Sequence, residues 1–233
     1  MLTAKPKSKR SDSSLLFQKS PKILAFANQK GGSGKSTGAI HAVDWFLQND
    51  RTALLVDADG QQSSSAWAKE LGMDHRVLSD PEALFDELPK FTQQYDVVVV
   101  DGPGNASEVT KAILIRSDMV LVPCRDSMID LASTGKIMQF IRQAQEIKRG
   151  GLVGAIYLNA VKENTILLRE AREALKQGIV PLLNTTLPDR QCIKDVPGQA
   201  STVFRMKGTP CKSAAKIFTQ LFTEALQLYE AQS

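Results

Sequence analysis

The stretch "NQKGGSGKST", residues 28–37, decides the fold of this chain. It follows a short apolar run, "KILAFAN" at 22–28, which we expect to be a buried strand, and it leads into a helix expected over 37–50. A strand, a glycine-rich turn and a helix N-terminus form an anion site, because backbone N–H groups point into the turn and the helix dipole favours negative charge. The order of elements therefore predicts a phosphate-binding loop.

Two lysines stand in this loop, and the second has an evident task. We expect Lys35 to reach the β- and γ-phosphates of a nucleotide, and the hydroxyl of Ser36 to bind Mg²⁺. The usual spacing G-x-x-x-x-G-K-[ST] requires glycine where Gln29 stands, so the match departs from it there. The residues expected to bind the nucleotide are Lys30, Gly31, Gly32, Ser33, Gly34, Lys35, Ser36 and Thr37.

Carboxylates follow two further apolar runs. "TALLVDAD" at 52–59 ends in Asp57 and Asp59, and "YDVVVVDGPG" at 95–104 runs through four valines into Asp101. Ligands of open α/β sheets bind at the carboxyl ends of parallel strands, so these side chains are expected at the same site. Asp101 is expected to hold a Mg²⁺-bound water. The alternative for Asp57 or Asp59 is that it only caps a helix beginning near Ser63.

The remaining chain continues the alternation of strands and helices. We expect helices over 63–72, 80–91, 106–116, 129–148, 164–177 and 211–230, and strands over 118–124, 151–159 and 180–187. This pattern predicts an α/β fold with a mostly parallel central sheet flanked by helices on both faces. We expect a single domain over 22–233. Asn159, at the end of its strand, is a candidate for the adenine pocket, and a simple strand-end turn is the alternative.

The composition of the chain limits its possible partners and locations. The chain has 233 residues, a formal net charge of +4 and a pI of about 8.9, which permits nucleic-acid contact without requiring it. Its three cysteines are scattered and form neither a C-x-x-C pair nor a disulfide framework, so a cytoplasmic location is expected. No apolar run approaches the roughly 20 residues that span a bilayer. Residues 1–21 are basic and polar, and we expect a flexible tail there.

The motif residues resemble a known family. K-G-G-S-G-K-S-T at 30–37 is similar to the deviant Walker A motif of ParA/MinD-type P-loop ATPases, with Lys30 as the signature lysine. D-A-D-G-Q at 57–61 resembles the family's D-x-D-P-Q, with Gly60 in place of the usual proline, and the strand ending in Asp101 is Walker B-like. The resemblance runs from about residue 22 to the C-terminus. It is closest to small ParA partition ATPases that lack an N-terminal helix-turn-helix.

This resemblance implies a mechanism built on ATP and Mg²⁺. It implies an ATP-bound homodimer in which Lys30 reaches the partner's nucleotide; the alternative is that Lys30 merely adds charge within its own subunit. It implies that Asp59 orients the attacking water and that Asp57 supports the metal shell, so that Lys30, Lys35 and Asp59 are the catalytic residues. Gly102 and Gly104 are expected to move with nucleotide state. Hydrolysis is expected to be slow, because no arginine finger is evident in the loop.

The partners follow from charge and from the same resemblance. Between Asp195 and Glu224 there is no acidic residue, and this stretch carries four basic residues, Arg205, Lys207, Lys212 and Lys216. The resemblance implies that they hold DNA without regard to sequence, near the nucleoid, and that dimerisation doubles the patch. A solvated basic face is the alternative. A ParB-like adaptor that stimulates hydrolysis is implied as well, with a plasmid or chromosome as cargo, or alternatively a protein assembly such as a carboxysome.

Two rival classes are open at this point. A MinD-like, membrane-cycling regulator would use the last helix, but nothing after Lys216 is basic, whereas lipid-binding helices carry lysines on their polar face. We therefore expect that helix to dock on the core. A P-loop enzyme acting on a metabolite, similar to dethiobiotin synthetase, would need a substrate pocket in place of a dimer face, and an iron–sulfur ATPase would need clustered cysteines.

Overall fold

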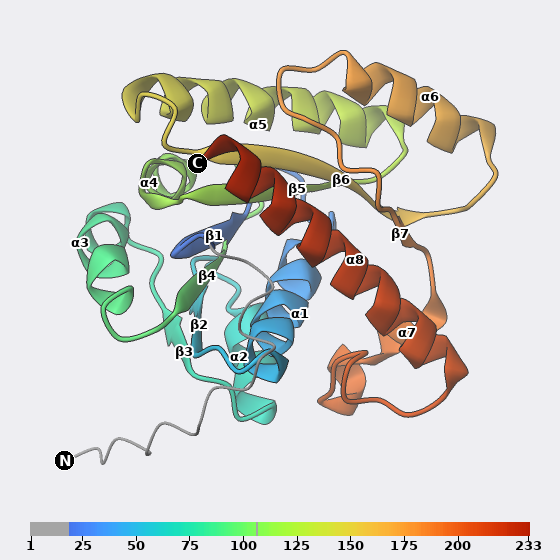
Figure 1. Cartoon of the computed structure of the whole chain (residues 1–233), viewed down its shortest axis with the longest axis horizontal. Helices are drawn as coiled ribbons and strands as arrows, with labels where there is room; N and C mark the ends of the chain where they lie inside the picture. The colour runs from blue at the N-terminus through green and yellow to red at the C-terminus, as the bar shows by residue number, and fades with distance from the viewer. Residues whose placement is uncertain (1–18, 106) are drawn as a thin grey trace.

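The computed structural model describes residues 19–105 and 107–233, so most of the expected tail at 1–21 lies outside the described residues. A single seven-stranded sheet forms the centre, in the order β3-β2-β4-β1-β5-β6-β7 (Figure 1). Every pairing between neighbouring strands in this sheet is parallel. The strands are β1 Ile23–Phe26, β2 Ala53–Asp57, β3 His75–Val77, β4 Val97–Asp101, β5 Met119–Cys124, β6 Val153–Val161 and β7 Leu187–Pro188.

Helices cover both faces of the sheet. On one face pack α1 Lys35–Gln48, α2 Ser63–Glu70 and α8 Thr209–Gln232, with the short α7 Gln191–Asp195 beside the start of α8. On the other face pack α3 Pro81–Phe91, α4 Glu108–Arg116, α5 Met128–Ile147 and α6 Ile166–Lys176. The predicted fold class is confirmed.

The alternation of side chains along β1 shows why both faces are needed. Leu24 and Phe26 join the core under α1 and α8, whereas Ile23 and Ala25 join the core under α3 to α6. A strand that is apolar on both sides must be covered on both sides, as central parallel strands are. The order of strands puts β1 between β4 and β5, so the loop after it opens at the middle of the sheet edge.

The strand expected over 180–187 is largely absent. Leu182 makes one isolated bridge to Ile156, and the only regular strand there is the two-residue β7. Pro181 and Pro188 have no N–H to give to a ladder, which confines such a segment to a sheet edge. Glu224 of α8 accepts hydrogen bonds from the backbone N–H groups of Asn184 and Thr185, which draws this segment away from the sheet.

Two short elements had no signal in the sequence. β3 has only three residues, with a histidine and an arginine among them, so no apolar run marks it. α7 has five residues, none of them buried. The last helix is two residues longer at each end than expected and buries Phe218, Leu221 and Phe222, so the prediction that it docks on the core is confirmed. Among the helices of residues 19–105 and 107–233, none combines the length and the apolar composition of a membrane-spanning helix.

A buried histidine joins α1 to the C-terminal part of the chain. The Nδ1 of His41 donates to the Thr37 carbonyl oxygen at 2.7 Å, and its Nε2 accepts from the backbone N–H of Val203 at 3.2 Å. The ring stacks on Phe218 of α8 with 4.3 Å between centroids. Burial lowers the pKa of His41 to about 4, although its contact with Thr37 and the charge of Asp44 oppose this shift. The imidazole is therefore neutral in the folded protein at neutral pH.

This pKa predicts a stability loss in mild acid. Because the folded pKa lies below the unfolded value of about 6.5, the unfolded chain gains a proton first, and stability falls as pH drops from about 6.5 towards 4. We expect His41 to account for about 2 kcal/mol of lost unfolding free energy between pH 7 and pH 5, measured by urea titration. His41→Gln should remove this part of the pH dependence of the unfolding free energy, and the control His75→Gln should not. An equal pH dependence in the wild type and both variants would contradict this account.

Candidate nucleotide-binding site

The N-terminus of α1 is left open by its sequence. Its N-cap is Gly34, with a φ of 102°, in the left-handed region that favours glycine, and this residue offers no side-chain cap. By contrast, α3, α5 and α6 are capped by the side chains of Asp80, Ser127 and Thr165. The first N–H groups of α1 are therefore available to an anion rather than to a side chain of this helix.

Asn159 of β6 binds the backbone of the phosphate loop. Its Nδ2 donates to the Ser33 carbonyl oxygen at 2.6 Å. A Cβ at Gly34 would lie 2.1 Å from that nitrogen, so only glycine fits this position. Asn159 is not among the described residues that line the cavity in front of the loop. Its assignment to an adenine pocket stays a prediction; its observed task is to position the phosphate loop.

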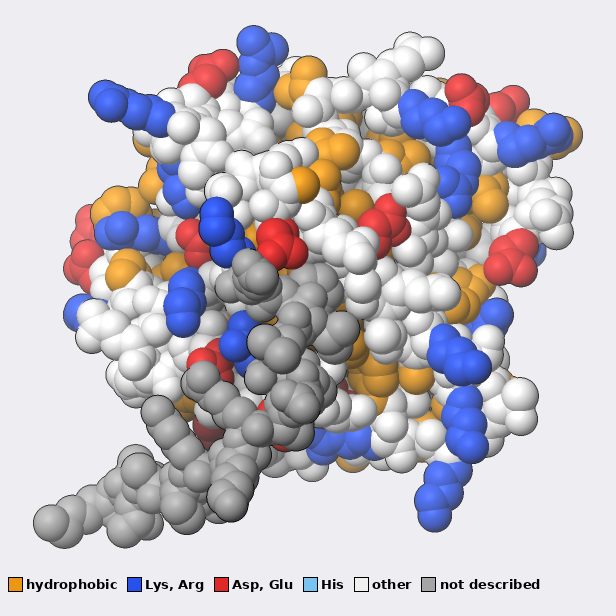
Figure 2. All heavy atoms as spheres, viewed as in Figure 1, with side chains coloured by type: hydrophobic (Ala, Val, Ile, Leu, Met, Phe, Trp, Pro, Cys, Tyr) orange, Lys and Arg blue, Asp and Glu red, His pale blue; other side chains and the backbone are white. Residues whose placement is uncertain are grey.

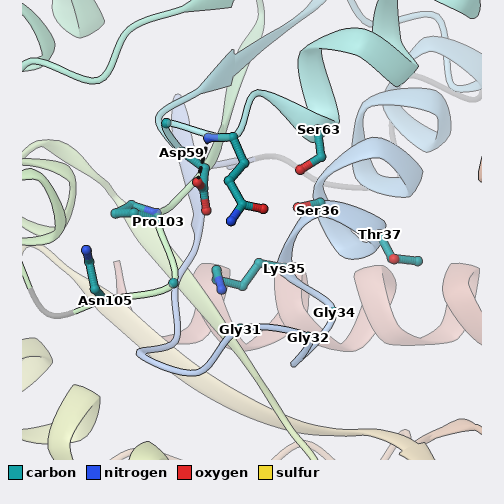
Figure 3. A pocket seen from close by; sticks show the side chains of 13 residues that line it. Gly31, Gly32, Gly34, Lys35, Ser36, Thr37, Asp59, Ser63, Pro103 and Asn105 are labelled. Carbon is teal, nitrogen blue, oxygen red and sulfur yellow. Dashed lines mark hydrogen bonds between the residues drawn. The ribbon is translucent and has the colours of Figure 1, made fainter.

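A cavity of about 630 Å³ lies in front of the loop (Figure 3). Three segments build it: the loop and first turn of α1, the stretch after β2, and the stretch after β4. The lining residues are Gly31, Gly32, Gly34, Lys35, Ser36, Thr37, Asp59, Gly60, Gln61, Ser63, Pro103, Gly104 and Asn105. Six of the eight residues expected from the loop are present, together with Asp59. Gln61, Ser63 and Asn105 were not predicted, since their only signal is that they follow the acidic strand ends.

Lys35 points into this cavity. Its Nζ donates to the Lys30 carbonyl oxygen at 3.2 Å, and Figure 3 shows the side chain lying below Asp59. Burial lowers the pKa of Lys35, and the negative charges of Asp101 and Asp59 oppose that shift. The ammonium group thus stands where a phosphate would offset the cost of its burial.

Asp101 has the most unusual environment of the acidic strand ends. Among the described residues, neither of its carboxylate oxygens has a hydrogen-bond partner of ordinary geometry, although both are buried. Burial raises the pKa of Asp101 to about 6, and Asp57 adds to this, while Ser36, Ser64 and Lys35 act in the opposite direction. An unpaired buried carboxylate beside the Ser36 hydroxyl is a donor set of the kind that Mg²⁺ prefers, so the residues present fit a nucleotide-bound Mg²⁺.

The other two carboxylates differ from each other. Asp57 uses both oxygens on the backbone: Oδ1 accepts from the Asp59 N–H at 3.1 Å and Oδ2 from the Ser65 N–H at 2.8 Å. This contact with the first turn of α2 is the helix-capping alternative, and a role in the metal shell stays a prediction. Asp59 accepts from the Gln61 N–H at 3.0 Å and lines the cavity, as its expected role requires.

Lys30 turns away from its own phosphate loop. Its Nζ donates to Asp130 Oδ2 at 2.7 Å, in an ion pair with a buried carboxylate on the first turn of α5. Ser127 also bonds Asp130. Lys30 lines a second cavity, of about 420 Å³, and not the one in front of the loop. No sequence signal connects Lys30 with a partner one hundred residues further along.

The four basic residues of the C-terminal stretch separate into two groups. Arg205 donates from Nε and Nη2 to Oδ1 of the buried Asp44, at 3.0 and 2.8 Å, and from Nη1 to the Leu71 carbonyl. Its guanidinium thus holds the chain together, which weakens its assignment to DNA. The exposed side chains of Lys207, Lys212 and Lys216 lie around the start of α8. Figure 2 shows lysine and arginine side chains gathered there, at the lower right.

A phosphate loop after the central strand of a parallel sheet, with acidic residues at the ends of two neighbouring strands, defines a P-loop nucleotide-binding fold. The chain belongs to the CobQ/CobB/MinD/ParA nucleotide-binding family, whose model matches residues 24–203. That match includes the loop, Asp57, Asp59, Asp101 and Asn159, and it ends before Arg205.

Two relatives and one solved structure show which proteins this chain is similar to. The chain is 29% identical over 209 residues to maintenance of carboxysome distribution protein A from Halothiobacillus neapolitanus, covering 87% of this chain and 95% of the relative. It is 22% identical to the chromosome-partitioning ATPase Soj from Thermus thermophilus, in a match that covers 87% of this chain and 94% of the relative. The fold is shared with cobyrinic acid a,c-diamide synthase from Mycobacterium smegmatis, whose structure was solved with an ATP analogue and magnesium. The TM-score is 0.70 at 20% identity, and the match covers 88% of this chain and 94% of the synthase chain.

The unpaired carboxylate gives a test of the metal site. We expect Asp101→Asn to leave the nucleotide-free protein as stable or more stable, because it removes a buried carboxylate that has no hydrogen bond of ordinary geometry among the described residues. The same change should reduce the gain in ATP affinity that Mg²⁺ provides by about tenfold or more, measured with a fluorescent ATP analogue.

Asp57→Asn is the matched control, since both Asp57 oxygens accept backbone N–H groups. It should lower the unfolding free energy by about 1–3 kcal/mol. If Asp101→Asn were the more destabilising of the two, or kept the full effect of Mg²⁺, the assignment of Asp101 would be wrong.

Proposed function

We propose that this protein is a ParA-type ATPase that binds ATP with Mg²⁺, pairs as a homodimer in the ATP state, and hydrolyses ATP slowly. One observation carries the proposal: an uncapped helix N-terminus faces the cavity, and the buried carboxylate of Asp101, which has no hydrogen-bond partner of ordinary geometry among the described residues, lies directly behind it, beside the cavity-lining Ser36. The first favours phosphate and the second favours a cation, so the pair favours a metal-bound nucleotide over a simple anion.

Each side chain has a role in this proposal. Lys35 and the loop N–H groups hold the phosphates, while Ser36 and Asp101 hold the Mg²⁺, which neutralises phosphate charge when bound. Asp59 orients the attacking water. No arginine is found among the described residues that line the cavity, so turnover is slow until an adaptor of the ParB type acts on the site.

The direction of Lys30 supports a role across a dimer interface. If Lys30 served its own nucleotide, its side chain would be expected in the nucleotide cavity beside Lys35, whereas it pairs with Asp130 and lines the second cavity. From there its charge can serve a partner's triphosphate more readily than its own. ATP binding and pairing then require the ion pair with Asp130 to be exchanged for one with phosphate.

The cargo divides the proposal into two versions. DNA binding through Lys207, Lys212 and Lys216, on the nucleoid in the cytoplasm, suits a plasmid or chromosome as cargo and a ParB-like partner. Similarity to the carboxysome distribution protein of Halothiobacillus neapolitanus favours a protein assembly as the second candidate. Both versions use the same cycle of ATP-dependent pairing. A membrane-cycling role has less support, because α8 is docked on the core.

Lys30→Gln tests the pairing. We expect the variant to bind ATP within a few-fold of the wild type, because Lys30 does not line the nucleotide cavity, but to stay monomeric with Mg²⁺ and a non-hydrolysable ATP analogue, because the charge that would cross the interface is lost together with the ion pair to Asp130. Sedimentation velocity measures the association. Lys111→Gln, in an exposed lysine paired with Glu108 on α4, is the control and should dimerise normally. A Lys30→Gln protein that still forms dimers with the analogue would refute the role.

DNA binding is tested by a mobility shift with ATP, ADP and no nucleotide. We expect a shift with ATP alone, and replacement of Lys207, Lys212 and Lys216 together by alanine should weaken it about tenfold or more and lower the salt slope by about one per lost phosphate contact. The control replaces three exposed lysines of the opposite helical layer, Lys90, Lys111 and Lys176. Equal loss in both triple variants would mean that overall charge, and not this patch, binds DNA.

A further inference from the structure

A groove lies between α3 and α4, two helices that pack side by side (Figure 1). We call it the α3–α4 groove. Its volume is about 510 Å³, and the described residues that line it are Pro81, Glu82, Phe85, Asp86, Glu108, Lys111, Ala112 and Ile115. Lys111 and Ile115 also line a smaller hollow of about 60 Å³, beside Phe140 and Ile147. Together the two hollows have room for a segment of chain rather than for a single side chain.

The ring of Phe85 shows which kind of side chain this groove accepts. Phe85 is 40% exposed although it is apolar. The guanidinium of Arg116, at the end of α4, stacks on this ring, with 3.4 Å between its carbon and the ring centroid. Such a stack combines attraction to the π-face with the contact of two flat groups. The part of the ring that is still exposed is therefore suited to an apolar or an arginine side chain from outside.

The charge of the groove is opposite to that of the whole chain. The chain has a formal net charge of +4, whereas three carboxylates and one lysine line the groove. The lysine, Lys111, pairs with Glu108 at 2.7 Å. Glu82 and Asp86 form no ion pair with another described residue. A partner that covers the groove should therefore bring positive charge, which excludes nucleic acid and favours a basic segment of protein.

The groove is connected to the nucleotide cavity through the first turn of α4. Glu108 and Lys111 line the groove, and Thr110 lies between them in the sequence. The buried Thr110 donates from Oγ1 to the Asn105 carbonyl oxygen at 2.8 Å. Asn105 in turn lines the nucleotide cavity (Figure 3). A partner that holds α4 thus acts on a wall of that cavity without entering it.

We propose that the α3–α4 groove is the docking site of the adaptor, which binds there through a segment that carries arginine and apolar side chains. The proposal rests on the adaptor-stimulated hydrolysis proposed above and names the surface that receives the adaptor. Arginines of the segment pair with Glu82 and Asp86, and an apolar side chain covers Phe85. Docking fixes α4 and, through Thr110, the loop that carries Asn105, so the adaptor raises turnover from outside the nucleotide cavity.

A synthetic peptide tests the binding to the full chain. The probe is a fluorescently labelled helical peptide with arginines on one face and leucines on the other, and the same peptide with glutamate for arginine is its control. We expect the arginine peptide to bind the double variant Glu82→Lys, Asp86→Lys about tenfold or more weakly than the wild type, measured by fluorescence anisotropy. The matched control, Glu163→Lys with Glu170→Lys, changes the same charge at two exposed positions and should bind as the wild type does. Equal loss in both double variants would mean that overall charge binds the peptide, which overturns the proposal.

ATP turnover tests the connection to the nucleotide. With Mg²⁺, ATP and DNA, the arginine peptide should raise the turnover of the wild type about fivefold or more. Thr110→Val should bind the peptide as the wild type does, which shows that its fold is intact, but should lose the stimulation because the bond to Asn105 is gone. A peptide that occupies the groove without changing wild-type turnover would overturn the assignment to the adaptor.

Two further outcomes separate this inference from its rivals and from the proposed function. If Glu82→Lys with Asp86→Lys changes the sedimentation of the protein without peptide, a second copy covers the groove, which overturns the proposal. If the wild type shows no ATP turnover, the proposed function is wrong, and the docking of an activating adaptor is wrong with it. If turnover is normal and both double variants bind the peptide as the wild type does, the proposed function stands and the groove is not the docking site.

Discussion

The open N-terminus of α1 is the constraint around which this molecule is arranged. Its first N–H groups have no carbonyl partners within the helix, and Gly34 supplies no cap of its own. A loop that must keep such groups exposed has to be held by other parts of the chain. Asn159 binds the Ser33 carbonyl, and Asn28 binds the Pro123 carbonyl while accepting from the Lys30 N–H. Side chains at the ends of β1 and β6 thus keep the loop open.

Two buried ionisable side chains, Lys35 and Asp101, have pKa values shifted by burial. Burial acts on Lys35 and Asp101 in opposite directions, lowering the pKa of the first and raising that of the second. Both shifts express the cost of keeping a charge out of water. Asp44 shows the contrasting case, since Arg205 and Thr202 bond its carboxylate. Asp44 is thus paired by residues of the chain itself, whereas neither oxygen of Asp101 has a hydrogen-bond partner of ordinary geometry among the described residues.

The sequence predicted the parts of the fold that depend on local pattern. Apolar runs and the loop motif located β1, β2, β4 and α1, and with them Lys35, Ser36, Asp59 and Asp101. Contacts between segments distant in the sequence could not be predicted from it. The ion pair of Lys30 with Asp130 and the hydrogen bonds of Arg205 to Asp44 leave no periodic pattern in the sequence. The strand prediction for 180–187 was largely wrong for a related reason, because the Asn184 N–H bonds Glu224, forty residues away, and not a neighbouring strand.

The neutral ring of His41 has a mechanical consequence. It connects the Thr37 carbonyl, in the first turn of α1, to the Val203 N–H, four residues before Lys207. Its stack on Phe218 adds α8 to the same unit. Helix α1, the His41 ring and helix α8 are thus joined by buried contacts, while Lys207 stands in the irregular segment between Val203 and α8. Because burial keeps this ring neutral, its protonation in acid would act on α1 and α8 together.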